Sequence, residues 1–174
     1  MDEAELRTQL ELHHEAAFGW ALGCSAADPD SARDTLHNAY RKILDGRARF
    51  KGGSSFKTWL FAVIRNTAAE ERRLRWLRHL RLGSYAEEQR DIVQSADRGC
   101  SMEKDESTAA LRQALARLPR RQQEILHLVF YQELTIEAAA GVMGVSLGSA
   151  RTHYDRGKKQ LGKLLKQSDH SHGR

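Results

Sequence analysis

Cationic and hydroxyl side chains gather near the end of the chain, directly after the glycine-containing corner "GVMGVSLGSA". The candidates in this stretch are Ser149, Arg151, Thr152, Asp155, Arg156, Lys158 and Lys159. Arginine donates paired hydrogen bonds to guanine edges, and hydroxyl and lysine side chains bind bases or phosphates. These residue types therefore favour binding of duplex nucleic acid rather than catalysis.

Charge is unevenly distributed along the chain. Residues 41–82 carry 12 basic and 3 acidic side chains, a net charge of +9, and residues 111–174 carry 11 and 5, a net charge of +6. Residues 1–40 have a net charge of −6 and residues 83–110 a net charge of −4. Two basic blocks separated by an acidic segment indicate two contacts with one polyanion. The alternative is that both basic blocks are ordinary solvent-exposed helix faces.

Other kinds of chemistry have little support in the sequence. It contains no phosphate-binding Walker loop, no nucleophile elbow and no paired-carboxylate motif, so we expect no enzymatic activity and no small-molecule substrate. Its histidines and cysteines show no metal-binding spacing, which predicts no metal and no cofactor. The residues considered for such a site are His13, His14, His170, His172, Cys24 and Cys100.

Length and composition favour a cytoplasmic protein. The chain has 174 residues, of which 40% are hydrophobic, and no apolar run reaches the roughly 20 residues of a membrane span. The segment "MDEAELRTQLELHHEAAF" opens with acidic residues, which predicts no secretory signal. Two cysteines without a disulfide framework fit a reducing compartment.

Helical periodicity dominates, so we expect an all-α fold. The pattern predicts a helix over about residues 4–24, a second capped by Asp30 or Ser31, and a third beginning after Ser54 or Ser55. The third has the strongest apolar face, and its aromatic side chains are expected to pack in the core. These side chains are Phe56, Trp59 and Phe61.

Fading periodicity divides the chain into two small helical domains, residues 1–82 and 109–168. They are joined by a flexible linker, residues 83–108, which is acidic and poor in large apolar residues. Residues 169–174 are expected to form a disordered tail.

A sharp corner lies within the second domain. Thr135 is placed to cap a short helix that ends at Gly144, and a longer helix begins near Ser146. Small residues Ala139 and Ala140 allow the two helices to cross closely. This arrangement is a helix-turn-helix, whose second helix enters a major groove, although the same shape also occurs as a plain packing motif.

The segment "LRQALARLPRRQQEILHLVFYQELTIEAAAGVMGVSLGSARTHYDRGKKQL" resembles the promoter-reading C-terminal domain of bacterial RNA polymerase sigma factors of the extracytoplasmic-function group. The matching positions are Leu118, Pro119, Thr135, Met143, Gly144, Gly148, Ser149, Arg151 and Arg156. The segment "RFKGGSSFKTWLFAVIRNTAAEERR" is similar to the first domain of the same family. The resemblance implies a sigma domain 2-like bundle followed by a sigma domain 4-like helix-turn-helix.

The resemblance also implies two DNA sites. The last domain would read the −35 element as duplex, with Arg120 and Arg121 joining the seven residues named first. The first domain would melt and read the −10 element, with Asn66 at the position of the base-pocket asparagine. The −10 candidates are Lys57, Arg65, Asn66, Arg72 and Arg73.

The resemblance implies a third surface, which would bind the clamp helices of core RNA polymerase. The last domain would bind the flap of the same enzyme. The residues on the third surface are Asp34, His37, Asn38, Tyr40 and Arg41. His37 and Asn38 depart from the family pattern, which has glutamine and glutamate there, so one carboxylate for a basic clamp residue is missing. The resemblance also implies an anti-sigma factor, in many cases membrane-bound, which would hold the protein at the inner membrane.

Two other interpretations remain open at this stage. The chain would be a self-sufficient helix-turn-helix regulator if residues 1–80 served for dimerisation or sensing. It would be a sigma-factor mimic if it bound the inhibitor without supporting transcription.

Overall fold

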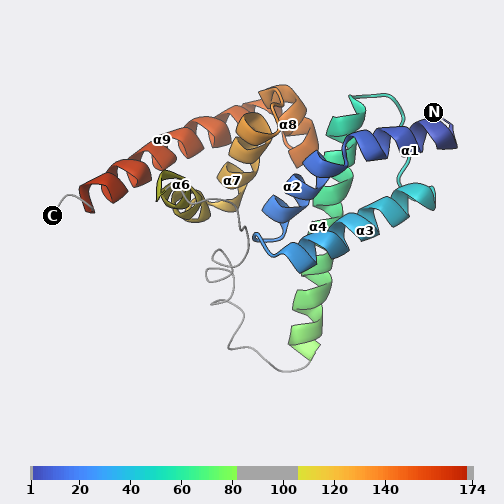
Figure 1. Cartoon of the computed structure of the whole chain (residues 1–174), viewed down its shortest axis with the longest axis horizontal. Coiled ribbons are helices and arrows are strands. Elements are labelled where there is room, and N and C mark those ends of the chain that lie inside the picture. Colours follow the sequence, from blue (N-terminus) through green and yellow to red (C-terminus); the bar gives the residue numbers. More distant parts are fainter. Residues whose placement is uncertain (1, 82–105, 172–174) are drawn as a thin grey trace. The chain divides into compact units, whose positions relative to one another are not determined.

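The computed structural model describes residues 2–81 and 106–171, and within these ranges every regular element is helical (Figure 1). The chain divides into two compact units, Met1–Arg98 (unit 1) and Gly99–Arg174 (unit 2). The all-α fold with two helical units is therefore confirmed.

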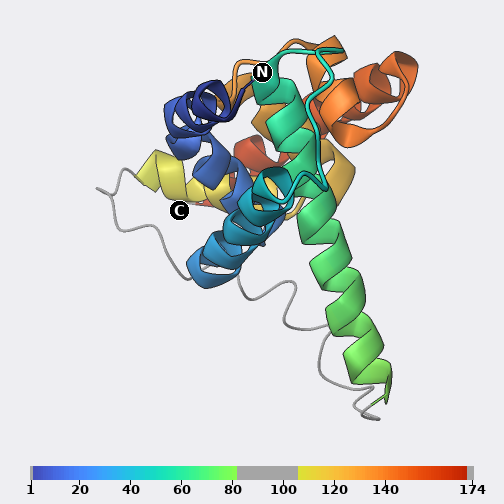
Figure 2. The ribbon, with the colours of Figure 1, turned by 90° about the vertical axis from the view of Figure 1, so that its right-hand side faces the viewer.

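The described part of unit 1, residues 2–81, contains four helices, α1 (Glu3–Leu12), α2 (His14–Cys24), α3 (Pro29–Leu44) and α4 (Phe56–Arg81). Helices α2, α3 and α4 pack against one another. Figure 2 shows that the C-terminal part of the long helix α4 extends beyond the other helices of this unit.

The core of unit 1 is centred on Trp20, which is 1% exposed. Its indole Nε1 donates a hydrogen bond to the carbonyl oxygen of Phe61 at 3.0 Å, so α2 is fixed to α4 by a polar and an apolar contact together. Phe56 and Phe61 are buried, and Trp59 is half-buried beside Phe50. The expected core role is confirmed for Phe56 and Phe61, whereas Trp59 lies at the edge of the core.

Two boundaries in unit 1 differ from the sequence prediction. The expected helix over residues 4–24 is broken at His13, whose ring stacks on Phe56 with centroids 5.9 Å apart. Neither glycine nor proline marks this break, which coincides with a tertiary contact. The N-cap of α3 is Asp28 rather than Asp30 or Ser31, because Pro29 suits the first helical turn, where its missing N–H costs nothing.

Unit 2 contains α6 (Glu106–Ala116), α7 (Arg120–Leu126), the π-helical turn η2 (His127–Tyr131), α8 (Ile136–Met143) and α9 (Leu147–Ser171). Helix α9 packs against α6, α7 and α8 and forms the spine of this unit.

The ends of unit 2 differ from the predicted domain limits. Helix α6 begins at Glu106, inside the predicted linker 83–108, so three polar residues before the alanine-rich segment also belong to the helix. Helix α9 continues to Ser171, inside the predicted tail 169–174. The rest of that linker, residues 83–105, and the rest of that tail lie outside the described residues.

The π-helical turn was not predicted, since the sequence reads as an uninterrupted helix through this region. The backbone N–H of Gln132 donates to the carbonyl oxygen of His127 at 3.2 Å, which closes the wide turn. Phe130 lies here, stacked on Tyr154 of α9 with centroids 6.0 Å apart. Pro119 is the N-cap residue of α7.

The corner between α8 and α9 follows the prediction. Gly144 adopts φ +63° and ψ 40°, the left-handed conformation that a Cβ disfavours. The Thr135 hydroxyl accepts the N–H of Ala138 at 3.1 Å, and the Ser146 hydroxyl accepts the N–H of Ser149 at 3.2 Å. Both helices that meet at the corner therefore begin with a side-chain cap.

Helix α9 approaches α7 very closely at Gly157. A Cβ at this position would lie 3.2 Å from Cδ1 of Leu126 and 3.3 Å from Cβ of Gln122. Ala150, which is 0% exposed, lies on the same buried side of α9, so small residues occupy both positions. The packing role of Gly157 was not predicted from the sequence.

Candidate nucleic-acid interface

The seven candidate residues of α9 share one surface. All of them are exposed, and at about 100° per residue they occupy one half of the helix, opposite Ala150 and Gly157. This surface, which we call the α9 outer face, consists of Ser149, Arg151, Thr152, Asp155, Arg156, Lys158 and Lys159. The geometry therefore brings the predicted residues together on one continuous solvent-exposed face.

Local contacts orient some of these side chains. The Thr152 hydroxyl donates to the carbonyl oxygen of Gly148 at 2.9 Å. The ammonium group of Lys158 lies 5.2 Å from the centroid of the Tyr154 ring, which keeps this cation at the edge of the face.

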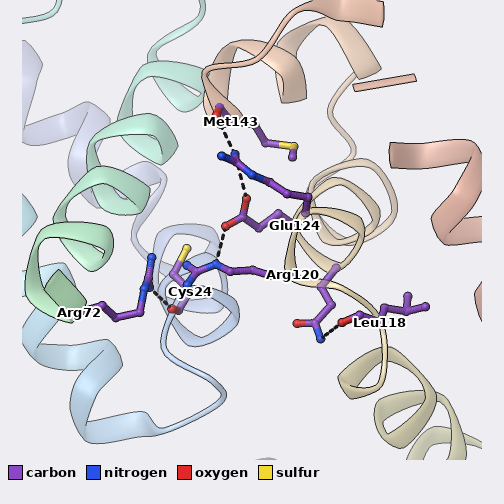
Figure 3. Close-up of polar contacts among 8 residues, drawn as sticks. Cys24, Arg72, Leu118, Arg120, Glu124 and Met143 are labelled. Atoms are coloured by element: carbon purple, nitrogen blue, oxygen red, sulfur yellow. Dashed lines mark hydrogen bonds and ion pairs between the residues drawn. The ribbon is translucent and has the colours of Figure 1, made fainter. Parts of the chain in front are cut away.

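Arg120 and Arg121 contact buried groups of unit 2 and also lie partly on its surface. The carboxylate of Glu124, which is 4% exposed, lies 3.0 Å from Nε of Arg120 and 3.8 Å from Nη1 of Arg121 (Figure 3). Nη1 of Arg121 also donates to the carbonyl oxygen of Met143 at 3.3 Å, just before the corner. Both arginines keep about half of their side chains exposed, so each has donors left for a phosphate.

The five −10 candidates on α4 do not share one face. At about 100° per residue, Asn66 and Arg73 lie on one side of the helix, and the other three lie on a different side. Asn66 and Arg73 are exposed, whereas the other three candidates are half-buried. The half-buried three are Lys57, Arg65 and Arg72.

Two of the half-buried cations contact the fold itself. Nη1 of Arg72 donates to the carbonyl oxygen of Cys24 at the end of α2, at 2.9 Å (Figure 3). The ammonium group of Lys57 lies 5.6 Å from the centroid of the Phe61 ring. These contacts give Arg72 and Lys57 packing roles that the sequence pattern did not indicate.

The candidate polymerase surface on α3 is also divided. Asp34, His37 and Arg41 are exposed. Tyr40 is half-buried, and its hydroxyl lies 3.2 Å from Nδ1 of His14 on α2. Burial raises the pKa of Tyr40 to about 12, so its hydroxyl stays protonated and available as a donor.

Asn38 faces α4 rather than bulk solvent. Its amide Nδ2 donates to Oε1 of Glu71 at 2.8 Å, and the hydroxyl of Thr35 donates to Oε2 of the same carboxylate at 2.6 Å. Sequence reasoning missed Glu71, because helical periodicity does not reveal contacts between helices, and it also missed Glu124, whose partners Arg120 and Arg121 lie on its own helix. For Glu124 the only signal was its spacing of four and three residues from Arg120 and Arg121.

Two histidines are shifted by their surroundings. Burial lowers the pKa of His127, in the π-helical turn, to about 4, so its ring is neutral near neutral pH. The pKa of His13 is lowered by burial first and by the nearby charge of Lys57 second.

No group of three metal-binding side chains occurs among residues 2–81 and 106–171. Likewise, none of the helices described here is long and apolar enough to cross a membrane.

Comparison with known families gives two matches in sequence order. The profile "Sigma-70 region 2" matches residues 10–78, and the profile "Sigma-70, region 4" matches residues 108–161. Each match falls on one of the two units, and the second includes the whole helix-turn-helix corner.

Individual proteins agree with these profiles. The chain is 27% identical over 143 residues to the RNA polymerase sigma factor YlaC of Bacillus subtilis, and the aligned region covers 80% of each chain. It is 29% identical over 151 residues to the ECF RNA polymerase sigma factor EcfG of Rhodopseudomonas palustris, covering 86% of this chain and 77% of the relative.

A similar fold occurs in the sigma factor RpoE of Bartonella quintana, solved in complex with the anti-sigma factor NepR. The TM-score is 0.70 at 22% sequence identity, and the similarity covers 93% of this chain and 97% of that one.

Proposed function

The chain belongs to the extracytoplasmic-function group of sigma-70 RNA polymerase sigma factors, and we propose that its two units divide promoter recognition between them. It is an alternative sigma factor, which binds core RNA polymerase and directs initiation at specific promoters. The observation that carries this assignment is the order of the two matches, region 2 before region 4, each on its own helical unit.

Unit 2 is proposed to read the −35 element as duplex DNA. The α9 outer face presents donors and cations on one side, as insertion of a helix into the major groove requires. We assign base reading to Arg151 and Arg156, and phosphate contact to Lys158 and Lys159. Arg120 and Arg121 would add phosphate contacts while Glu124 holds them in place.

Unit 1 is proposed to open and hold the −10 element. Asn66 and Arg73 are exposed on one side of α4, which suits a flipped base and the phosphate beside it. Lys57, Arg65 and Arg72 would contribute positive potential from a different side of the helix, while part of each side chain is used in packing.

The exposed side of α3 is proposed to bind the clamp helices of core polymerase, and unit 2 is proposed to meet the flap. Asp34, His37 and Arg41 are the exposed members of the α3 surface. Tyr40 would act indirectly, because its hydroxyl links α3 to His14 of α2.

An anti-sigma factor is a further proposed partner. The similar chain of Bartonella quintana was crystallised with one, which supports the same type of control here. We place the protein in the cytoplasm, at the inner membrane whenever its anti-sigma factor is membrane-bound. Because catalysis of RNA synthesis belongs to the polymerase, we assign this chain no enzymatic activity, metal or cofactor.

Run-off transcription with core polymerase tests the function. We expect transcripts from a cognate promoter when this chain is the only initiation factor present. A self-sufficient helix-turn-helix regulator would bind DNA yet give no transcript without another sigma factor. A mimic would give no transcript but would bind the anti-sigma factor.

A further inference from the structure

A hollow of about 220 Å³ lies between α3 and the C-terminal part of α4 in unit 1. It is bordered by charged and polar side chains from both helices, namely Ser31, Asp34, Asn38, Glu71, Arg75 and Arg78. Two of them, Asp34 and Asn38, belong to the surface assigned above to polymerase binding. The hollow therefore continues that surface from α3 onto α4.

The carboxylate of Glu71 is held in a fixed position at this hollow. Oε1 accepts the amide of Asn38 at 2.8 Å, and Oε2 accepts the hydroxyl of Thr35 at 2.6 Å. Thr35 is 1% exposed and Glu71 is half-buried, so the donors anchor the carboxylate from the protein side. A carboxylate held by two donors loses little conformational entropy when it binds a further partner.

Each carboxylate oxygen of Glu71 can accept more than the one hydrogen bond described. An ionised carboxylate offers about four acceptor positions, and it binds arginine through both oxygens when they are aligned. Asp34 adds a second carboxylate at the same hollow. A basic side chain entering from outside would therefore meet two acidic groups, one of them already oriented, beside the cations of Arg75 and Arg78.

The contact with Asn38 also bears on how this chain departs from its family. The family pattern has a glutamate where this chain has Asn38, and the amide of Asn38 touches a carboxylate supplied by α4. The acidic group is thus present at this place in the structure, although it comes from another helix.

On the basis of the proposed function, we propose that Glu71 is a polymerase-binding residue that receives a basic side chain of core RNA polymerase, with Thr35 and Asn38 as its positioning residues. Arg75 and Arg78 border the same hollow, so the best partner is a surface on which a basic side chain has an acidic neighbour.

The test is equilibrium binding of the full chain to core polymerase, measured for Glu71→Gln and for Glu70→Gln. Glutamine keeps the shape of the side chain and removes its charge. Glu71→Gln should weaken binding about tenfold, as expected for loss of one charge-assisted hydrogen bond, and the effect should shrink at high salt. Glu70 is the matched control, since it pairs with Lys42 at 2.6 Å and lies outside the hollow.

A double variant that exchanges the amide and carboxylate groups of residues 38 and 71 tests whether the Glu71 carboxylate binds polymerase or only stabilises the fold. In Asn38→Glu/Glu71→Gln the carboxylate moves to α3 and the amide to α4, so the hydrogen-bonded pair is kept. We expect this double variant to regain most of the affinity lost in Glu71→Gln. An affinity as low as that of Glu71→Gln would overturn the proposal, as would equal binding by Glu71→Gln and the wild type.

Asp34→Asn distinguishes failure of this inference from failure of the proposed function. If Asp34→Asn weakens polymerase binding and Glu71→Gln does not, the α3 surface stands and Glu71 has no part in it. If neither variant changes binding, the assignment of the α3 surface itself is wrong. Thermal unfolding of each variant, expected to match the wild type within a few degrees, excludes loss of the fold as the cause.

Discussion

Helices α4 and α9 are both long and cationic, but the two units use their charges differently. On α9 all seven candidate residues are exposed on one half of the helix, and Ala150 and Gly157 are buried on the opposite side. On α4 the five candidates divide between two sides, and Arg72 is bound to the end of α2. A basic helix in a sequence can therefore mean a binding face, or a binding face combined with polar links to neighbouring helices.

The difference follows from how each helix is anchored. Helix α4 packs through large side chains such as Leu60, Phe61 and Ile64, and polar groups around this core link it to α2 and α3. Helix α9 approaches its neighbours closely at Ala150 and Gly157, and Tyr154 packs on Phe130. Its seven candidate side chains lie away from these contacts and are exposed.

The largest expected difference between the units is in their response to acid. Burial lowers the folded-state pKa of His127 to about 4, below the ordinary value of 6.5, so the unfolded chain takes up a proton before the folded chain does. Unit 2 should keep its full stability above about pH 6.5 and lose on the order of 3 kcal/mol as the pH falls toward 4.

Two optical signals resolve this loss. All three tryptophans, Trp20, Trp59 and Trp76, belong to unit 1, so their fluorescence reports that unit, whereas far-ultraviolet circular dichroism reports helices in both. We expect the dichroism to change at a higher pH than the fluorescence, and His127→Gln to reduce the separation. Coincident transitions would show that the units do not differ in this respect.

Substitutions on the α9 outer face should affect DNA binding without affecting stability. Arg151→Ala and Arg156→Ala should each weaken binding to a duplex with the native −35 sequence by about 1–3 kcal/mol, because each would remove a proposed base contact. Fluorescence anisotropy with native and scrambled duplexes makes the comparison. Equal losses on both duplexes would instead assign these arginines to phosphate.

A valine at Gly157 should destabilise unit 2 by about 1–3 kcal/mol, since its Cβ would meet Leu126 at 3.2 Å and the crossing would be overpacked. Gly162→Val is the matched control, because a Cβ there meets nothing within 4 Å. Chemical denaturation followed by circular dichroism should show a clear loss for the first variant only. Equal stabilities would mean that the close approach of α9 and α7 is unimportant.

Substitution of the neighbouring residues Arg72 and Arg73 on α4 should affect stability in one case and promoter opening in the other. Arg72→Met loses the hydrogen bond to the Cys24 carbonyl and should lower the free energy of unfolding by about 1 kcal/mol. Arg73→Met should leave stability within about 0.5 kcal/mol, because Arg73 is exposed, but should slow promoter opening. The reverse pattern would exchange the two assignments.

Much of the fold follows from sequence signals that act locally. The corner at Gly144, the cap at Thr135 and the buried aromatic residues of α4 were predicted because glycine conformation, capping and periodicity depend on a few neighbouring residues. The N-cap of α3 was predicted at Asp30 or Ser31 but lies at Asp28, because Pro29 begins the helix.

What was missed depends on contacts between helices. The break at His13 and the π-helical turn have no glycine or proline to mark them. The carboxylate of Glu71, on α4, binds partners on α3 that periodicity does not place. The candidate site on α9 was predicted as one face because its residues lie on a single helix, whereas the division of the α4 candidates depends on where α2 and α3 pack.

The rate of promoter opening with the Asn66→Ala variant most directly tests the proposal that unit 1 opens the −10 element while unit 2 reads the −35 element. Permanganate footprinting of promoter complexes with core polymerase measures opening, and anisotropy with a −35 duplex measures the initial contact. We expect Asn66→Ala to bind the duplex as the wild type does but to open the −10 region more slowly, while Arg151→Ala shows weak duplex binding. Normal opening by Asn66→Ala would contradict the account, because α4 would then have no part in holding the melted strand.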